Sequence, residues 1–86
     1  MPFVYLLRCR DGSLYAGAAV DLERRLRDHR AGRASRYTRS RLPVELAWSL
    51  EVDSWIAALK EEARIKGLDR AAKEELIAVA GTPPRG

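Results

Sequence analysis

The sequence predicts a small α/β domain of the α+β type, with a three-stranded, mainly antiparallel sheet flanked by helices. Three observations lead to this prediction. Asp11-Gly12 separates two apolar, aromatic runs, which is a strong hairpin signal. Residues 44–52 alternate between apolar and polar side chains, as a strand with one covered face does. Later segments repeat their apolar residues at helical spacing. The expected chain order is strand, strand, helix, strand, helix, helix.

The length and composition of the chain are typical of one globular domain. Its 86 residues are 47% hydrophobic and 33% charged. No apolar run approaches the roughly 18 residues of a membrane span and no secretory pattern opens the chain, so we expect no membrane partner and a cytoplasmic location. Cys9 is the only cysteine, which excludes disulfide frameworks and Cys-based zinc sites. We expect one domain over residues 1–81 and a flexible tail over residues 82–86.

Positive charge is concentrated in the first half of the chain. The formal net charge is +4, and residues 1–43 carry ten arginines and no lysine against four acidic residues. Residues 44–86 carry six basic and eight acidic residues. Because guanidinium groups bind phosphates through two parallel hydrogen bonds, a polyanion is the expected partner. Charge alone does not distinguish nucleic acid from an anionic membrane surface.

The predicted hairpin places two tyrosines on neighbouring strands. Gly12 can adopt the positive φ of a primed two-residue turn at no steric cost. Tyr5 and Tyr15 are not directly opposed in such a hairpin. They share one face of the sheet if a bulge or a strand offset takes up the difference.

The first predicted helix begins after Asp21, runs from Leu22 to Arg30 or Ala31, and stops at Gly32. Positions i, i+3, i+4 and i+7 of its inward stripe are Leu22, Arg25, Leu26 and His29. Two interpretations of the polar members are open. Either the arginine extends to the rim and the histidine is a hydrogen-bonded core residue, or both belong to a site.

Residues 32–43 lack a lasting apolar period and are predicted to form a loop with one helical turn. This segment is rich in groups that bind phosphate or stack on bases, namely Arg33, Arg36, Tyr37, Arg39 and Arg41. Its three hydroxyl residues could add further donors. The alternative is a solvated basic loop without a partner.

Three more elements complete the prediction. A strand from Val44 to Val52 is followed by an Asp53-Ser54 cap and a helix from Trp55 to Lys66, which stops at Gly67. A last helix from Arg70 to Ala80 has Asp69 as its cap and Gly81 as its stop.

The helix over residues 55–66 is predicted to have a broad apolar arc, formed by Trp55, Ile56, Ala58, Leu59, Ala63 and Ile65. Glu62 projects from within that arc, whereas Glu61 lies outside it. An ion pair between Glu62 and Lys66, four residues apart, is the alternative to a functional role.

Two tripeptides in the hairpin carry a family resemblance. Val4-Tyr5-Leu6 and Tyr15-Ala16-Gly17, ten positions apart at the tyrosines, resemble the paired tripeptides of the GIY-YIG nuclease domain. The resemblance extends through residues 21–26, His29, residues 36–38 and the helix around residues 58–66. It therefore covers most of the chain and is similar to the small single-domain bacterial members.

The resemblance implies an endonuclease that uses Mg²⁺ or Mn²⁺ to hydrolyse a DNA phosphodiester by in-line attack of water, with repair or recombination intermediates as candidate substrates. By position, Glu62 matches the metal-ligating carboxylate and Arg25 the arginine that holds the scissile phosphate. Tyr5, Tyr15 and His29 match the groups that position or deprotonate the water. We favour Tyr5 as the base, with His29 as proton relay and Tyr15 as the orienting group, although the two tyrosine roles could be exchanged.

The chain also departs from the family pattern. Ala18 and Ala19 follow Gly17 where many relatives carry a hydroxyl or a lysine, and the chain contains no Asn or Gln. These absences leave open a catalytically weak or inactive nucleic-acid-binding module on the same fold. An interaction domain for anionic surfaces or proteins is a third alternative.

Overall fold

A computed structural model describes residues 1–80, with no account of the Ala80 side chain. Its elements follow one another as β1 (Phe3–Arg8), β2 (Leu14–Ala19), α1 (Leu22–Arg30), α2 (Arg36–Arg39), β3 (Glu45–Glu51), α3 (Trp55–Lys66) and α4 (Arg70–Ala80). The predicted order of strands and helices is confirmed, and α2 is the expected helical turn. The predicted stop at Gly81 and the tail 82–86 lie outside the described residues.

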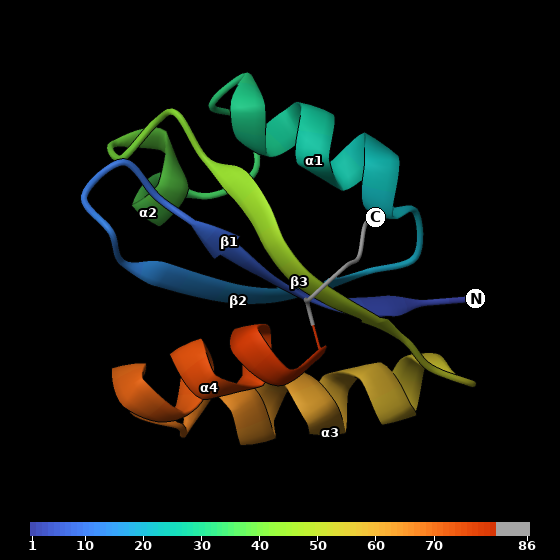
Figure 1. Ribbon diagram of the computed structural model, residues 1–86. Helices are drawn as coiled ribbons and strands as arrows, with labels where there is room; N and C mark the ends of the chain where they lie inside the picture. Colours follow the sequence, from blue (N-terminus) through green and yellow to red (C-terminus); the bar gives the residue numbers. More distant parts are fainter. Residues whose placement is uncertain (81–86) are drawn as a thin grey trace.

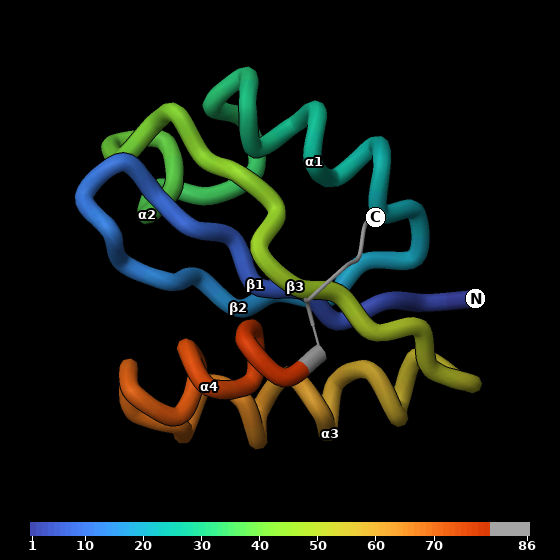
Figure 2. The backbone as a smooth tube through the Cα atoms, viewed as in Figure 1, coloured from blue at the N-terminus to red at the C-terminus, as the bar shows by residue number. Residues whose placement is uncertain are grey.

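The three strands form one sheet in the spatial order β2-β1-β3, and both pairings are antiparallel. Helices α1 and α2 lie on one face of the sheet, and α3 and α4 lie on the other (Figure 1). The backbone trace shows β1 running between its two neighbours (Figure 2). The central strand is therefore covered on both faces, in agreement with its four fully buried residues, 4–7.

The register of β1 and β2 places the two tyrosines on one face. Tyr5 pairs with Gly17, and Tyr15 pairs with Leu7, two positions further along the hairpin. Side chains on one strand alternate between faces, so Tyr5 and Tyr15 are diagonal neighbours on the same face. The strand offset considered from the sequence is confirmed, and no bulge interrupts this pair of strands.

The turn of the hairpin differs from the prediction. Cys9 to Ser13 form a five-residue connection rather than a two-residue primed turn. Gly12 has the expected positive φ of +86°, but no residue other than glycine has a positive φ within residues 1–80, so Asp11 does not take part in a type I′ turn. The Asp11 carboxylate instead accepts hydrogen bonds from the Ser13 backbone N–H and hydroxyl, at 3.0 and 2.6 Å. This local bonding favours the longer turn.

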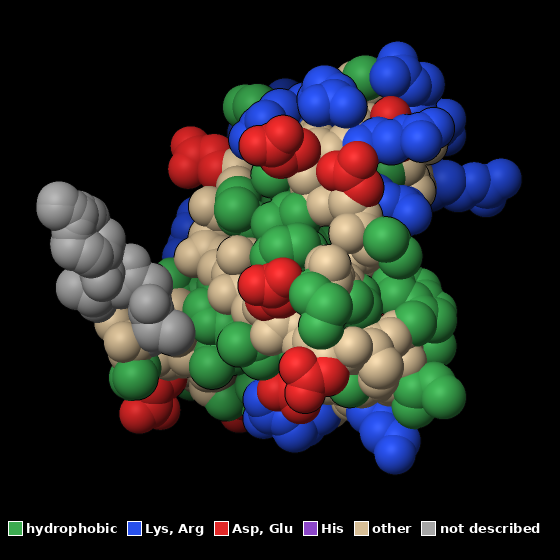
Figure 3. All heavy atoms as spheres, turned by 90° about the vertical axis from the view of Figure 1, so that its right-hand side faces the viewer, with side chains coloured by type: hydrophobic (Ala, Val, Ile, Leu, Met, Phe, Trp, Pro, Cys, Tyr) green, Lys and Arg blue, Asp and Glu red, His purple; other side chains and the backbone are tan. Residues whose placement is uncertain are grey.

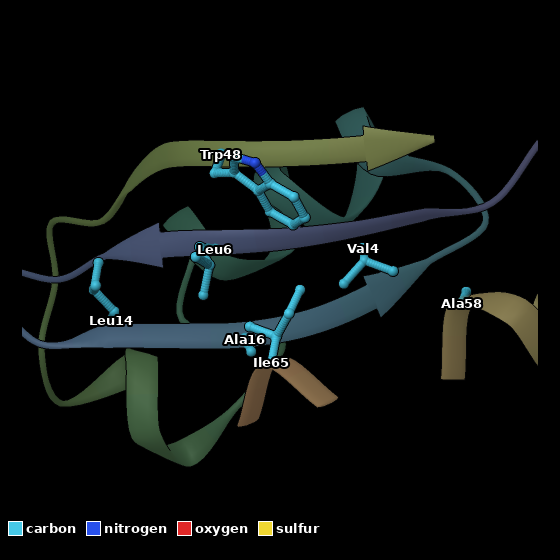
Figure 4. Close-up of a cluster of buried hydrophobic side chains, with 7 residues drawn as sticks. All are labelled: Val4, Leu6, Leu14, Ala16, Trp48, Ala58 and Ile65. Carbon is cyan, nitrogen blue, oxygen red and sulfur yellow. The ribbon is translucent and has the colours of Figure 1, made fainter. Parts of the chain in front are cut away.

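The core between the sheet and α3 draws on all three strands. It consists of Val4, Leu6, Leu14, Ala16 and Trp48 from the strands and Ala58 and Ile65 from α3, drawn as sticks in Figure 4. The opposite core, beneath α1, contains Tyr5, Leu7, Cys9, Ala19, Leu26 and Val44. Burial raises the pKa of the Cys9 thiol, as expected for a structural rather than a reactive cysteine.

Side-chain caps fix the beginnings of the helices. Asp21 accepts a hydrogen bond from the Arg24 backbone N–H, and Asp69 accepts one from Ala72. Ser54 caps α3 through Ala57. These contacts satisfy backbone donors that have no partner within a helix. None of the helices in the described part of the chain has the length and apolar character needed to cross a membrane.

The apolar arc of α3 is narrower than predicted. Only Ala58 and Ile65 are buried, whereas Trp55, Ile56 and Leu59 are 43%, 65% and 44% exposed. Helix α3 rests on β1 and β2, and α4 packs against β3, so the flanks of α3 are left open. Helical phase gives the direction of each side chain, but the width of the covered face depends on the neighbouring elements.

The third strand is shorter than predicted and does not keep one buried face. A bulge at Ala47 arises because Leu6 pairs with Trp48 while Leu7 pairs with Leu46. As a result, Val44 joins the core beneath α1, whereas Trp48 joins the core against α3. The prediction of a single apolar face from Val44 to Val52 was wrong, because an extra residue reverses the alternation.

Candidate active site

The centre of the candidate site is a hydrogen bond between two buried side chains. Tyr5 of β1 and His29 of α1 are 2% and 1% exposed. The Tyr5 hydroxyl lies 2.9 Å from His29 Nε2. His29 can point at the sheet because it belongs to the inward stripe of α1, with Leu26 one turn earlier. The core position predicted for this histidine is confirmed.

Thr38 of α2 completes a chain of hydrogen bonds through the imidazole. Its Oγ1 lies 2.8 Å from His29 Nδ1, and its side chain is fully buried. The Thr38 hydroxyl donates to the Ser35 carbonyl at 3.4 Å, which leaves its oxygen free to accept from Nδ1–H. We therefore assign the proton of the neutral ring to Nδ1, with Nε2 accepting from the Tyr5 hydroxyl. We did not predict this role for Thr38; its place in the Arg36-Tyr37-Thr38 motif was the available signal.

Burial keeps both members of the central pair neutral near pH 7. The pKa of His29 is lowered, first by burial and second by the positive charge of Arg25, against an opposing effect of Asp28. The pKa of Tyr5 is raised above its ordinary value, mainly by burial, with smaller contributions from Tyr15 and Glu62. Arg25 acts in the opposite direction on Tyr5. The Tyr5 hydroxyl can therefore act as a base only if it passes its own proton on.

Gly17 makes room for the Tyr5 ring. A Cβ atom at Gly17 would lie 2.5 Å from both Cζ and the hydroxyl oxygen of Tyr5. No side chain could occupy that position without moving a buried phenol. The glycine of the second tripeptide is therefore a steric requirement of the tyrosine in the first, which the sequence alone did not reveal.

Tyr15 joins the buried pair to the surface loop. Its ring makes an edge contact with His29 at a centroid distance of 5.4 Å and stacks on Tyr37 at 5.7 Å. The guanidinium of Arg41 lies 3.8 Å from the centre of the Tyr37 ring. Tyr37 was predicted to be available for stacking on a base. In the structure its ring already has two partners, the Tyr15 ring on which it stacks and the Arg41 guanidinium.

Arg25 and Glu62 belong to helices on opposite faces of the sheet, α1 and α3. Arg25 is exposed, as expected for a side chain that extends from the inward stripe of α1 to the rim. The Glu62 side chain is 20% exposed and pairs with Lys66 at 3.3 Å. The charges of both residues influence the pKa of Tyr5, which Arg25 lowers and Glu62 raises. The ion pair considered as the alternative for Glu62 is present.

The preceding glutamate has a different partner. Glu61 binds Arg64 through two hydrogen bonds of 2.6 and 3.2 Å, and this pairing lowers the pKa of the Glu61 carboxyl group. The arrangement agrees with the helical phase predicted for the two acids, with Glu62 toward the sheet and Glu61 beside Arg64.

The donors around Glu62 are consistent with one hard divalent ion. No group of three or more His, Cys, Asp and Glu residues occurs within the described residues, so a protein-only cage for zinc or calcium is not offered there. Mg²⁺ and similar ions retain several waters and take one or two carboxylates, with substrate phosphates completing the shell. The single carboxylate of Glu62, 20% exposed, matches that requirement.

The arginine loop divides into two pairs. Arg33 lies 3.4 Å from Asp28, and Arg41 lies 3.0 Å from Asp11. Arg36 and Arg39 are exposed and form no ion pair among the residues that the structure describes. These two side chains are the members of the predicted phosphate-binding set that have no competing carboxylate.

Comparisons with known proteins identify the family and agree with the fold. Residues 1–75 match the family model of the GIY-YIG catalytic domain, and the chain belongs to that family. It is similar to UPF0213 proteins of bacteria and archaea. One from Natronomonas pharaonis is 47% identical over 76 residues, which cover 88% of this chain and 89% of the relative. One from Vibrio cholerae is 48% identical over 77 residues, which cover 88% and 76%.

A solved structure gives the same result for the fold. The solution NMR structure of a UPF0213 protein from Bacillus halodurans has a TM-score of 0.63 and 38% sequence identity. The match covers 96% of this chain and 89% of the other. The predicted family and fold class are therefore confirmed.

Proposed function

We propose that this protein is a divalent-metal-dependent DNA endonuclease that hydrolyses one phosphodiester bond by in-line attack of water. The observation that carries the proposal is the buried chain Tyr5–His29–Thr38, whose tyrosine end lies within the electrostatic reach of Arg25 and Glu62. Membership of a catalytic domain family supports an enzymatic role. Repair or recombination intermediates are the substrate class that we favour.

The hydrogen-bond chain offers a route for the proton of the attacking water. The neutral Tyr5 oxygen accepts that proton while the Tyr5 hydroxyl proton moves to His29 Nε2. The imidazole becomes a cation and continues to donate from Nδ1–H to Thr38. The new hydroxide oxygen bonds to phosphorus as the bond to the leaving oxygen breaks. Tyr5 suits this role better than Tyr15, because Tyr15 meets the imidazole through a ring edge.

Arg25 and Glu62 supply the charges that the reaction requires. The exposed guanidinium of Arg25 binds two oxygens of the scissile phosphate and stabilises the charge that develops there. Glu62, which pairs with Lys66 in this structure, would hold the divalent ion, Mg²⁺ or Mn²⁺. When bound, such an ion polarises a phosphoryl oxygen and stabilises the leaving oxygen.

A nucleic-acid-binding module with weak or absent catalysis is the second candidate. The observation in its favour is that Ala18 and Ala19 offer no side-chain donor beside the site. The exposed Arg36 and Arg39 would bind phosphates in either case.

A nicking assay with two matched variants tests the proposal. Supercoiled and branched DNA are incubated with Mg²⁺, Mn²⁺ or EDTA and with the wild type, Glu62→Gln or Glu61→Gln. We expect metal-dependent nicking that falls by about a hundredfold or more in Glu62→Gln, because an electrostatic contact made in the transition state is removed. Glu61→Gln should stay near wild type, because its partner is Arg64.

The same pair of variants distinguishes a metal ligand from a structural acid. Mn²⁺ relaxation is measured with DNA present. The contribution that depends on the protein should be absent with Glu62→Gln and present with Glu61→Gln. If both variants keep this contribution, Glu62 is only the partner of Lys66 and does not bind the metal. Binding of DNA without nicking under any metal condition would support the second candidate.

A further inference from the structure

A pocket lies beside Arg25. It has a volume of about 440 Å³ and lies between the start of α1 and the start of α3. Its walls include Val20, Asp21, Arg24, Arg25, Asp28 and Trp55. We call it the Trp55 pocket. Its volume falls within the roughly 300–1,000 Å³ typical of ligand sites.

Trp55 gives this pocket a partly exposed aromatic wall. Trp55 is 43% exposed, and Val20, which also lines the pocket, is 67% exposed. Figure 3 shows this end of the molecule, where Lys and Arg side chains gather in the upper part, over α1, and hydrophobic side chains lie below them. A flat aromatic group can stack on a half-exposed tryptophan, and the neighbouring arginines favour a group that is attached to a polyanion.

The polar wall of the pocket carries both donors and acceptors. Arg24 and Arg25 bring guanidinium groups, and Asp21 and Asp28 bring carboxylates. The Asp21 carboxylate caps α1 through the Arg24 backbone N–H, and Asp28 lies 3.4 Å from Arg33, so each retains free lone pairs. Two positive and two negative groups do not favour a phosphate alone. They match the mixed donors and acceptors on the edge of a nucleobase.

We infer that the Trp55 pocket binds one unpaired nucleobase, stacked on the indole, next to the phosphate held by Arg25. The inference rests on the proposed function in that nucleic acid is the ligand. It narrows the substrate class to DNA with a single-stranded or frayed segment at the cut, because a base in a duplex is not free to enter a pocket. Arg25 belongs to both sites and sets the spacing between base and phosphate.

Binding measured without cleavage tests this inference. A short single-stranded oligonucleotide and the same strand with abasic positions are titrated in EDTA against the wild type and Trp55→Leu. Loss of one base–aromatic stack should weaken binding of the normal strand roughly five- to hundredfold. The abasic strand should bind both proteins about equally, since the Arg contacts persist.

Two further measurements protect the test from indirect effects. Ile56→Ala changes a neighbouring side chain that is 65% exposed and does not line the pocket, so it should bind both strands as the wild type does. In a Trp48→Phe background Trp55 is the only tryptophan. Its emission should then be quenched by the normal strand and not by the abasic one.

The outcomes separate this inference from the proposed function. Equal affinity of wild type and Trp55→Leu for the normal strand, or equal losses on both strands, would overturn the inference even if nicking is observed. A change in self-association alone would also overturn it and assign this face to protein contact. Base-dependent binding through Trp55 without nicking would support the inference and contradict the endonuclease proposal.

Discussion

The Tyr5 ring occupies the space that a side chain at Gly17 would fill. The two residues are paired across β1 and β2, and a Cβ at Gly17 would lie 2.5 Å from the Tyr5 hydroxyl. The two tripeptides of the hairpin are thus one steric unit, since the glycine of the second lets the tyrosine of the first reach His29.

Gly17→Ala should therefore destabilise the fold and displace the tyrosine. We expect a loss of about 1–3 kcal/mol in the free energy of unfolding, the usual cost of overpacking, measured by urea denaturation. Gly67→Ala is the matched control. Its added Cβ would meet nothing closer than 3.5 Å at a φ of −79°, so stability should be unchanged or rise by about 0.4–1 kcal/mol. A neutral Gly17→Ala would show that the Tyr5 ring can move freely.

Thr38→Val should remove the hydrogen bond that orients the imidazole. A buried Nδ1–H without a partner costs about 1–3 kcal/mol of stability, and the ring would lose its tautomer preference. Nitrogen NMR shifts of His29 report the tautomer directly, and nicking should fall tenfold or more, within the range of general acid–base effects. Thr38→Ser keeps the hydroxyl and should keep both the tautomer and the activity. An unchanged tautomer in Thr38→Val would contradict our proton assignment.

His29 should make stability depend on pH in a defined window. Because its pKa is lowered in the folded state, the unfolded chain binds more protons as pH falls below about 6.5, and the folded state is destabilised. The free energy of unfolding should fall by up to about 1.4 kcal/mol per pH unit as the pH drops below roughly 6.5. The chain has one histidine, so His29→Gln should flatten this slope. A slope that persists in His29→Gln would place the titrating group elsewhere.

Arg25→Ala should separate catalysis from stability. The side chain is exposed, so the free energy of unfolding should change by no more than about 0.5 kcal/mol. Single-turnover nicking should be abolished, and Arg25→Lys should recover little, because an ammonium lacks the planar fork that holds two phosphate oxygens. Unfolding of Arg25→Ala would instead identify a structural residue.

Salt dependence should identify which arginines of the loop contact phosphate. Arg36→Gln with Arg39→Gln should reduce the slope of log affinity against log salt by nearly two for duplex DNA, since each phosphate that is no longer neutralised lowers it by about 0.9. Arg33→Gln with Arg41→Gln should reduce it less, because Asp28 and Asp11 already neutralise those groups. Equal slopes for wild type and the Arg36/Arg39 variant would move the DNA surface away from the loop.

Local chemistry explains which parts of the fold could be predicted. The caps at Asp21 and Asp69 and the glycine after α1 act within a few residues, so the helix boundaries were readable from the sequence. The bulge at Ala47 and the exposure of Trp55 depend on neighbouring elements that come from elsewhere in the chain. Pattern alone therefore overestimated the buried face of β3 and of α3.

The candidate site, like the fold, could be predicted in part from the sequence. Helical spacing grouped Arg25 with His29 and separated Glu62 from Glu61. The family resemblance then gave roles to Arg25, His29 and Glu62. The structure showed that Arg25 is exposed and added Thr38, whose contact with His29 spans nine residues across a loop. Such a contact leaves no periodic signal in the sequence, so only the fold could reveal it.

Helix α2 has only four residues, too few to be stable on its own, yet it holds Thr38 against His29 and Tyr37 against Tyr15. Its order therefore depends on the rest of the molecule. Melting of this one turn would release the imidazole while the sheet and its two hydrophobic cores stay intact. On heating, the activity of the Tyr5–His29–Thr38 site should therefore be lost at a lower temperature than the global unfolding transition, because α2 melts first.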